Sequence, residues 1–326
     1  SITRHADILT ISKRADVFVS SRRLRLFQRP VDKLMHANRE ALEAQFGPAN
    51  GAPLSFNDMD APHHLKYRNL TSKHFTPRAM RAFAPKIAAL AKDHVGRFAR
   101  RLEGGDGAPL DLVQELAVKV PTAAIFQMLG VPPEQHDELF TLWEDTVRSS
   151  PEERNREVEE DAASVFFHPQ GKGQRYLAKM IDETRERGAT GDDLLSALLS
   201  ARVDGEPLPQ QALVSYVMLL IAAGLDTTRH ATTGGVSLLL EHPDQLDRLI
   251  ADPSLIESAV EEILRYTSPV IHFMRTAVAD FELEGQTIRE GDSVALWYPS
   301  ANRDEAVFDR PYELSLIHIS EPTRRH

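Results

Sequence analysis

The chain has 326 residues, of which 42% are hydrophobic, and a formal net charge of −10 at pH 7. This length supports one large domain or two ordinary ones with a sizeable core, and the acidic balance argues against general binding to nucleic acids or anionic membranes. Because the sequence contains no cysteine, disulfides, zinc–thiolate sites and cysteine nucleophiles are excluded for this chain.

The amino terminus shows no secretion signal, because Ser1–Thr10 lacks an apolar core of the necessary length. The longest apolar run has about fourteen residues, whereas a membrane span needs roughly twenty. We therefore expect a cytoplasmic protein without a membrane span.

The amino-terminal part of the chain has mainly helical patterns. Ser1–Ser20 predicts a strand followed by a short helical segment, and Leu24–Asn57 is irregular and rich in proline. Pro151–Asp161 is a charge run typical of a solvated face, and Val203–Pro209 reads as a turn. Caps, prolines and glycines set the expected helices: Asp60–Lys73, Thr76 to about Arg101, Asp111–Leu129, Pro133–Arg148, Gly173–Gly188, Asp192–Ala201, Pro209–Glu241 and Pro253–Tyr266.

The pattern changes after Pro269, where short runs have strand composition and are separated by Glu284-Gly285 and Glu290-Gly291 turns. These runs are Phe273–Ala277, Phe281–Leu283, Gln286–Ile288 and Ser293–Tyr298. The sequence therefore predicts one mainly α domain with a small β part.

The helix Pro209–Glu241 should be buried, because its run Ala212–Leu225 is hydrophobic on all sides. It would be roughly 50 Å long. Its centre nevertheless contains Gly224, Asp226 and Thr227, which weaken a helix and favour a bulge or kink. The groove so formed has two alternative uses: a proton-delivery site that employs the carboxylate and the hydroxyl, or a place for structural water.

Three further patterns have both a functional and an ordinary interpretation. Glu262 and Arg265 are three apart on one helix and can pair, as many surface ion pairs do. His64 and Arg68 are four apart and face the same way, which makes a site only if an anion lies opposite. Arg275 lies within an apolar strand-like run, so it faces either water or a buried anion.

Taken together and in order, these motifs resemble those of bacterial cytochromes P450, over roughly residues 1–311. The matching segments are Asp60-Ala61-Pro62-His63-His64 with Arg68, Phe75-Thr76-Pro77-Arg78, Ala223-Gly224-Leu225-Asp226-Thr227-Thr228, His242-Pro243, Glu262-Ile263-Leu264-Arg265, Arg275-Thr276-Ala277, Ser300-Ala301-Asn302-Arg303-Asp304 and Phe308-Asp309-Arg310-Pro311.

The resemblance implies a role for the centre of the long helix. Asp226 and Thr227 match the acid–alcohol pair that relays protons during oxygen activation. Ala223 and Gly224 match the groove that accommodates oxygen beside the haem.

The resemblance also implies cofactor-binding and structural residues. His64, Arg68 and Arg275 match side chains that hold the haem propionates. Glu262 and Arg265 match a buried pair that braces the core, and Arg303 would belong to a small structural motif before the haem loop.

The substrate region implied by the resemblance is apolar. Leu24–Asn57 falls where the family has its substrate-covering loop. The lining of the pocket would come from Leu219, Ala222, Ala223, Val270, Ile271, His272 and Phe273. The segments 272–277 and 297–305 look like those of members that act on sterols, terpenoids or branched lipids.

By resemblance the natural gene encodes a haem b monooxygenase that hydroxylates a lipophilic small molecule with O2. Electrons would come from a ferredoxin and its NAD(P)H-dependent reductase.

The sequence departs from the family at one decisive point, since the family needs a cysteine thiolate as axial iron ligand. No cysteine and no such loop follow Pro311. The segment Leu314–Arg324 instead resembles a translated transposase adapter, so residues 314–326 are interpreted as a non-native tail after a P450-like fragment, residues 1–313; a divergent natural tail is the alternative. The fragment, incomplete at both ends, is expected to lack a metal ligand and to be inactive.

A second hypothesis comes from another class. A non-catalytic helical protein that binds a small apolar ligand would need no cysteine. A helical nucleic-acid binder is disfavoured by the net charge.

Overall fold

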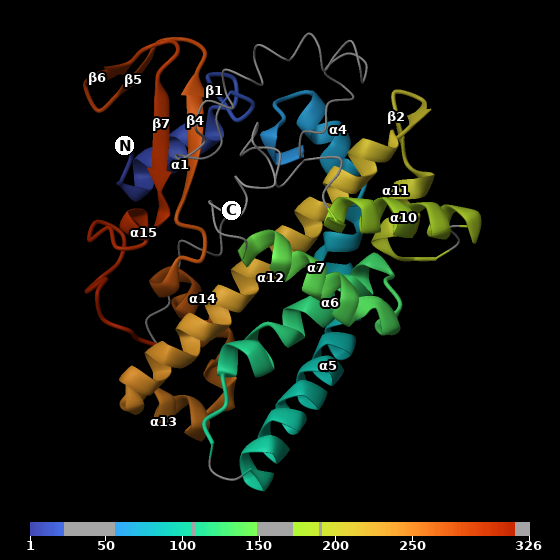
Figure 1. Ribbon diagram of the computed structural model, residues 1–326. Helices are drawn as coiled ribbons and strands as arrows, with labels where there is room; N and C mark the ends of the chain where they lie inside the picture. The colour runs from blue at the N-terminus through green and yellow to red at the C-terminus, as the bar shows by residue number, and fades with distance from the viewer. Residues whose placement is uncertain (23–55, 106–107, 149–171, 189–190, 317–326) are drawn as a thin grey trace. The chain divides into compact units, whose positions relative to one another are not determined.

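The computed structural model describes residues 1–22, 56–105, 108–148, 172–188 and 191–316 (Figure 1). The chain forms two compact units. Unit 1 comprises Ser1–Leu26, Asp111–Ala117 and Asp226–His326, and unit 2 comprises Phe27–Leu110 and Val118–Leu225. The long helix α12 (Gln210–Glu241) contributes its first half to unit 2 and its second half to unit 1.

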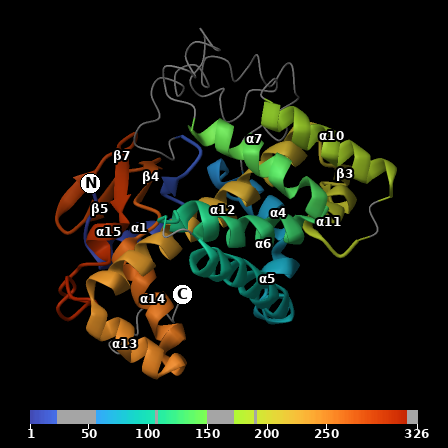
Figure 2. The ribbon, with the colours of Figure 1, turned by 60° about the horizontal axis from the view of Figure 1, so that its bottom comes forward.

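Unit 2 is helical around a core that the first half of α12 shares with α6 and α11. Its largest fully buried side chains include Phe126, Leu129, Leu198, Leu213 and Ile221. In Figure 2, α5 runs beside α6 and α7 beside α10. The elements are η2 (Phe56–Asp58), α4 (His63–Asn69), η3 (Ser72–Phe75), α5 (Pro77–Gly104), α6 (Lys119–Leu129), η5 (Pro133–Gln135), α7 (His136–Arg148), α10 (Lys172–Glu186), α11 (Leu194–Ser200), β2 (Arg202–Val203) and β3 (Glu206–Pro207).

The helix ends in unit 2 follow local chemistry. Thr76 caps α5 by accepting a hydrogen bond from the Ala79 N–H, and Pro77 occupies the first turn. Gly130 ends α6 in the left-handed conformation, with φ of 81°. The Asp193 carboxylate caps α11 by accepting from the Ser196 N–H.

Unit 1 combines a small antiparallel sheet with short helices. The sheet has the order β1-β4-β7, and β4 pairs with β7 in the register Phe273↔Leu296 and Arg275↔Val294. The elements are α1 (His5–Lys13), β1 (Phe18–Val19), the π-helical segment η4 (Val113–Ala117), α13 (Pro243–Ala251), η6 (Pro253–Leu255), α14 (Ile256–Thr267), β4 (His272–Ala277), β5 (Phe281–Leu283), β6 (Gln286–Ile288), β7 (Ser293–Trp297) and α15 (Tyr298–Ala301). The predicted fold class, mainly α with a small β part, is confirmed.

Several predicted elements were wrong in detail. At the amino terminus the helix α1 precedes the strand β1, because Ile8 and Ile11 are spaced to bury one helical face. The helix expected over Asp111–Leu129 is divided into η4 and α6. The helix expected over Asp60–Lys73 is confined to α4 and followed by η3.

Other elements were not predicted. The turn expected at Val203–Pro209 is a hairpin of β2 and β3, closed by Asp204 and Gly205 at positive φ. The helix α13 begins at Pro243, with His242 as the single residue between it and α12. Most of Leu24–Asn57, all of Pro151–Asp161 and the tail beyond Leu316 lie outside the described residues.

Among the described residues, α12 is the one helix long and apolar enough to cross a membrane, and 56% of its apolar window is buried inside the protein. A buried core helix has the same length and composition, so this feature is weak support for a membrane span.

Candidate functional site

The centre of α12 is an uninterrupted α-helix, so the bulge expected around Gly224 is absent. The glycine has a packing reason instead: a Cβ at this position would lie 3.2 Å from the Ile125 side chain of α6. α12 therefore approaches α6 closely at Gly224. This contact, within unit 2, gives no support to a groove on that side of the helix.

One face of the buried half of α12 is left partly open. Leu219 and Ala222 are half-buried and Ala223 is exposed, whereas nearly all their neighbours from Ala212 to Leu225 are buried. Residues three and four apart lie on the same side of a helix. The residues predicted to line a pocket thus share an accessible apolar stripe on unit 2.

The acid of the predicted proton relay has a cationic partner. An Asp226 Oδ1 atom lies 2.9 Å from the Arg229 Nη2 atom, one turn along α12. The two side chains are only 27% and 15% exposed, so this ion pair is more shielded from solvent than a typical surface pair. Thr227 is half-buried beside it. Sequence reasoning missed Arg229, although its spacing from Asp226 is that of a helical ion pair.

His64 and Arg68 lie on α4 in unit 2, one turn apart as predicted. His64 is half-buried, and its ring stacks on that of Phe56 at a centroid distance of 6.1 Å. Arg68 is exposed. Within the described part of the chain, Arg68 has no carboxylate partner.

The helix α4 is attached to α12 by buried hydroxyl groups that the sequence did not suggest. The Tyr216 hydroxyl donates to the Tyr67 carbonyl at 3.0 Å and lies 2.9 Å from the Thr71 hydroxyl. Burial raises the pKa of Tyr216, and the hydrogen bond with Thr71 opposes that rise. A neutral tyrosine is therefore the donor. On the outer side, Lys66 forms an ion pair of 2.6 Å with Asp204 of the β2–β3 turn.

The third predicted cation, Arg275, lies in unit 1 on β4. It is half-buried, and its Nη1 donates to the Met274 carbonyl at 2.7 Å. Among the described residues it forms no ion pair with a carboxylate. Burial raises the pKa of Tyr298, whereas nearby Arg275 lowers it. Phe273 shares the Arg275 side of the strand, because alternate residues face the same way.

The remaining predicted pocket residues of unit 1 precede or begin β4. Val270 is half-buried, and Ile271 is 56% exposed. The rings of Phe273 and Tyr298 meet edge to face at 6.2 Å. Ile271 and Phe273 thus leave apolar surface accessible at the start of this strand.

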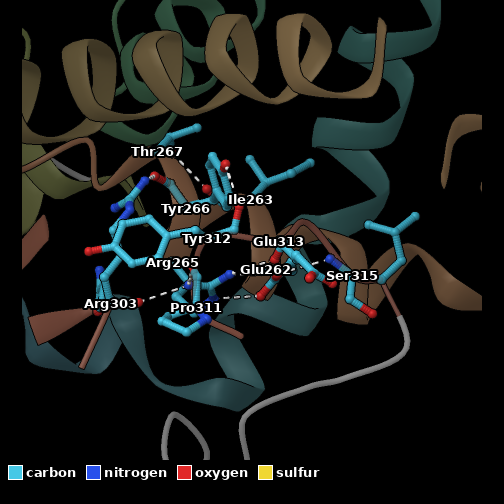
Figure 3. Close-up of polar contacts among 12 residues, drawn as sticks. Glu262, Ile263, Arg265, Tyr266, Thr267, Arg303, Pro311, Tyr312, Glu313 and Ser315 are labelled. Carbon is cyan, nitrogen blue, oxygen red and sulfur yellow. Dashed lines mark hydrogen bonds and ion pairs between the residues drawn. The ribbon is translucent and has the colours of Figure 1, made fainter. Parts of the chain in front are cut away.

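Glu262 and Arg265 form a buried bidentate pair in unit 1 (Figure 3), with both N···O distances at 2.7 Å. The side chains are only 4% and 5% exposed. The ordinary surface interpretation is therefore wrong, because α14 turns these residues inward. Arg265 also donates to the carbonyls of Asn302 and Pro311, both at 2.8 Å.

The pair and its neighbours organise the segment after β7. Arg303 donates to the Tyr266 carbonyl at 2.9 Å, which links the turn after α15 to the end of α14. The Glu262 carboxylate accepts from the Ser315 N–H at 3.1 Å, and Gln245 accepts from the Leu316 N–H at 3.2 Å. Backbone N–H groups make both contacts, so they do not depend on which side chains follow Pro311.

A polar cavity of about 310 Å³ lies elsewhere in unit 2, between η3 and the start of α11. Its lining includes Lys73, His74, Asp192 and Ser196. Burial lowers the pKa of His74, and its Nε2 atom has no hydrogen-bond partner. None of the residues predicted to bind cofactor or substrate lines this cavity.

Comparison with known proteins gives consistent matches. The family model "Cytochrome P450" matches residues 31–318. A methyl-branched lipid omega-hydroxylase of Mycobacterium tuberculosis is 34% identical, over 96% of this chain and 69% of its own length. A steroid C26-monooxygenase of the same organism is 32% identical, over 99% of this chain and 68% of its own.

Solved structures agree with these matches. A Mycobacterium marinum cytochrome P450, CYP268A2, in complex with pseudoionone superposes with a TM-score of 0.81 at 35% identity, covering 98% of this chain and 72% of that one. A Bacillus subtilis relative is covered over 65% of its length. The chain thus spans about two thirds of the curated relatives it matches. The resemblance predicted from the motifs, and the haem cofactor it implies, are confirmed at the level of the family.

Proposed function

The chain belongs to the cytochrome P450 family, and on that premise we propose that the natural protein is a monooxygenase that hydroxylates a lipophilic small molecule. One oxygen atom of O2 enters a C–H bond of the substrate, and two electrons and two protons convert the other to water. The observation that carries this proposal is the open apolar stripe of Leu219, Ala222 and Ala223, one turn before Asp226 and Thr227 on α12.

Asp226 and Thr227 are proposed to hold and move the protons that this reaction consumes. A carboxylate and a hydroxyl next to each other can pass a proton from solvent to a reacting group. The Asp226 carboxylate is held by Arg229 at 2.9 Å, which fixes its position. Thr227 lies four residues after Ala223, so it shares the side of α12 that carries the apolar stripe.

Each unit, taken by itself, offers a guanidinium group suited to a haem propionate. Arg68 and Arg275 are guanidinium groups without a carboxylate partner in the described part of the chain, and arginine pairs well with carboxylates. His64 lies one turn from Arg68 on α4. When bound, the haem supplies the redox chemistry that activates O2.

The axial ligand does not fit, because the sequence has no cysteine. We therefore propose that this chain lacks thiolate ligation and is inactive. The residues from Leu314 onward are proposed to be foreign to the natural gene, and their backbone contacts to Glu262 and Gln245 are compatible with any non-proline sequence. Reading the genomic sequence beyond Glu313 tests this directly, and a thiolate-type Soret band in the reduced CO complex of this chain would contradict inactivity.

The proposed substrate is a sterol, terpenoid or branched lipid. Relatives named as a lipid hydroxylase and a steroid monooxygenase support this class, as does the apolar stripe. We propose a ferredoxin with its NAD(P)H-dependent reductase as electron source, and a cytoplasmic location. Spectral-shift titration of the completed protein with these lipid classes tests the substrate.

The test of mechanism uses the completed gene product and the substitution Thr227→Ala. Product formed per NAD(P)H consumed should fall about tenfold or more, since positioned proton donors contribute at least that much. Thr232→Ala, at an exposed position on the same helix, is the matched control and should keep the wild-type ratio of product to NAD(P)H. An equal ratio in the two variants would refute the proton-relay role.

The alternative is a helical protein that binds a small apolar ligand without catalysis, as the missing cysteine would allow. The completed gene decides: a cysteine in a glycine-rich loop supports the enzyme, and its absence supports the binding protein.

A further inference from the structure

The helix α4 is too short to fix its own orientation. It has seven residues, from His63 to Asn69, and no side chain caps its amino terminus. Isolated helices shorter than about 12–15 residues are marginal in water, so tertiary contacts must hold this one. The orientation of His64 and Arg68 therefore depends on what α4 is attached to.

The buried attachment is at the carboxyl-terminal turn. The Tyr216 hydroxyl donates its single proton to the Tyr67 carbonyl, one of the helix-end carbonyls that need a partner. The Thr71 hydroxyl, 2.9 Å away, must then donate to the Tyr216 oxygen. Tyr216, Thr71 and Tyr67 are 2%, 3% and 5% exposed, so water does not substitute for these bonds.

The ring of Tyr216 extends the attachment to the other end of α4. Its centroid lies 4.7 Å from that of Phe56, and the Phe56 ring stacks on His64. The hydroxyl thus fixes the turn next to Arg68, while the ring supports the surface on which His64 rests. Both effects come from one side chain of α12, within unit 2.

We propose that Tyr216 is a positioning residue that orients α4 so that His64 and Arg68 can receive the propionates of the haem. The proposal rests on the proposed function, because the propionate role of the two cations belongs to it. Tyr216 itself need not touch the cofactor. Its hydroxyl acts through the Tyr67 carbonyl and Thr71, and its ring through Phe56.

The test measures propionate recognition in the 326-residue chain rather than catalysis. Iron protoporphyrin IX and its dimethyl ester, in which both carboxylates are blocked, are titrated separately and followed by Soret absorbance. The wild-type chain should bind the free acid about tenfold or more tightly than the ester, as expected for charge-assisted bonds. Arg68→Ala should lose most of this preference, and Tyr216→Phe should lose it to within about twofold of Arg68→Ala.

Matched variants separate positioning from loss of structure. Tyr176→Phe removes a hydroxyl from α10 in the same unit and should keep the preference. Thr71→Val should reduce it and Thr71→Ser should restore it, which keeps the test valid if Tyr216→Phe folds poorly. Hydrogen exchange should speed up about tenfold in α4 of Tyr216→Phe, and less in α11.

The outcomes distinguish the inference from its premise. If the wild-type chain prefers the free acid and Tyr216→Phe retains that preference, the positioning role is wrong while the propionate role of Arg68 stands. If the wild-type chain does not discriminate between the two porphyrins, the propionate role fails, and the positioning role fails with it.

Discussion

Among the described residues, unit 1 contains a buried ion pair and unit 2 a buried cluster of hydroxyl groups, so the two differ in charge. In unit 1 the ionised pair of Glu262 and Arg265 binds backbone groups around it. In unit 2 the uncharged hydroxyls of Tyr216 and Thr71 bind each other and the backbone carbonyl of Tyr67. A buried charge that loses its partner is left without compensation, whereas a neutral group loses only its hydrogen bonds. Removing one member of the ion pair should therefore lower the free energy of unfolding much more than removing one hydroxyl group of the neutral cluster.

The largest expected effect is in unit 1. Arg265→Ala should lower the free energy of unfolding by about 3–5 kcal/mol, because Glu262 would remain buried and unpaired. Arg310→Ala is the control, since its 2.7 Å pair with Glu313 is 56% and 61% exposed, and should cost at most about 1 kcal/mol. Urea unfolding measures both. Similar losses of unfolding free energy in the two variants would mean that burial does not determine how much each ion pair stabilises the protein.

The close helix contacts of the two units also differ, and this predicts the next effect. A Cβ at Gly235 would lie 2.8 Å from Ile263 on α14, whereas a Cβ at Gly224 would lie 3.2 Å from Ile125. Gly235→Ala should therefore cost about 1–3 kcal/mol by overpacking. Gly224→Ala should cost clearly less, because its contact is looser while alanine favours the helix by about 1 kcal/mol at both positions. Thermal unfolding of both variants tests the order. Adding Ile263→Val should recover part of the Gly235→Ala loss.

Local sequence signals predicted the helices but not the contacts between residues that are distant in the sequence. The long helix was predicted to within a residue, because its apolar run and flanking prolines are local signals. Gly224, together with Asp226 and Thr227, gave a wrong expectation of a bulge, because the need for Gly224 comes from Ile125, which is far away in the sequence. The spacing of Glu262 and Arg265 predicted that they pair. It left open whether they pair in water or in the core, which depends on tertiary packing.

The positioning contacts of α4 had no local signal at all. Tyr216 lies beside Ser215 in the largely apolar run Ala212–Leu225. That run assigned it to the core, and nothing indicated its hydroxyl partners. Asp204-Gly205 was placed in a turn, but the hairpin strands of two residues each are too short for an alternating pattern. The spacing of His64 and Arg68, by contrast, correctly predicted that the two lie one turn apart on a single helix.

Alkaline pH should next destabilise both units, through Tyr216 in unit 2 and Tyr298 in unit 1. Burial raises the pKa of Tyr216 above its ordinary 10.0, so its contribution to stability is fully present below pH 10 and lost as pH rises through the folded pKa. Tyr216→Phe should cost about 1–2 kcal/mol at pH 7 and make stability decline less steeply above pH 10. Burial also raises the pKa of Tyr298, and Arg275 opposes that rise as Thr71 does for Tyr216, so Tyr298→Phe should flatten the decline as well. Urea midpoints between pH 7 and 11 test this, and an unchanged slope in either variant would contradict it.

The smallest effect is expected at the exposed attachment of α4. Lys66 and Asp204 are 40% and 60% exposed despite a distance of 2.6 Å, so solvent screens their attraction. A double-mutant cycle with Lys66→Ala and Asp204→Asn should give a coupling of at most about 1 kcal/mol, and it should shrink further in about 1 M salt. Asparagine is chosen because Asp204 has a φ of 54°, which asparagine tolerates better than alanine. A coupling that is insensitive to salt and as large as the loss in Tyr216→Phe would mean that the surface pair, and not the buried hydroxyl, holds this helix in place.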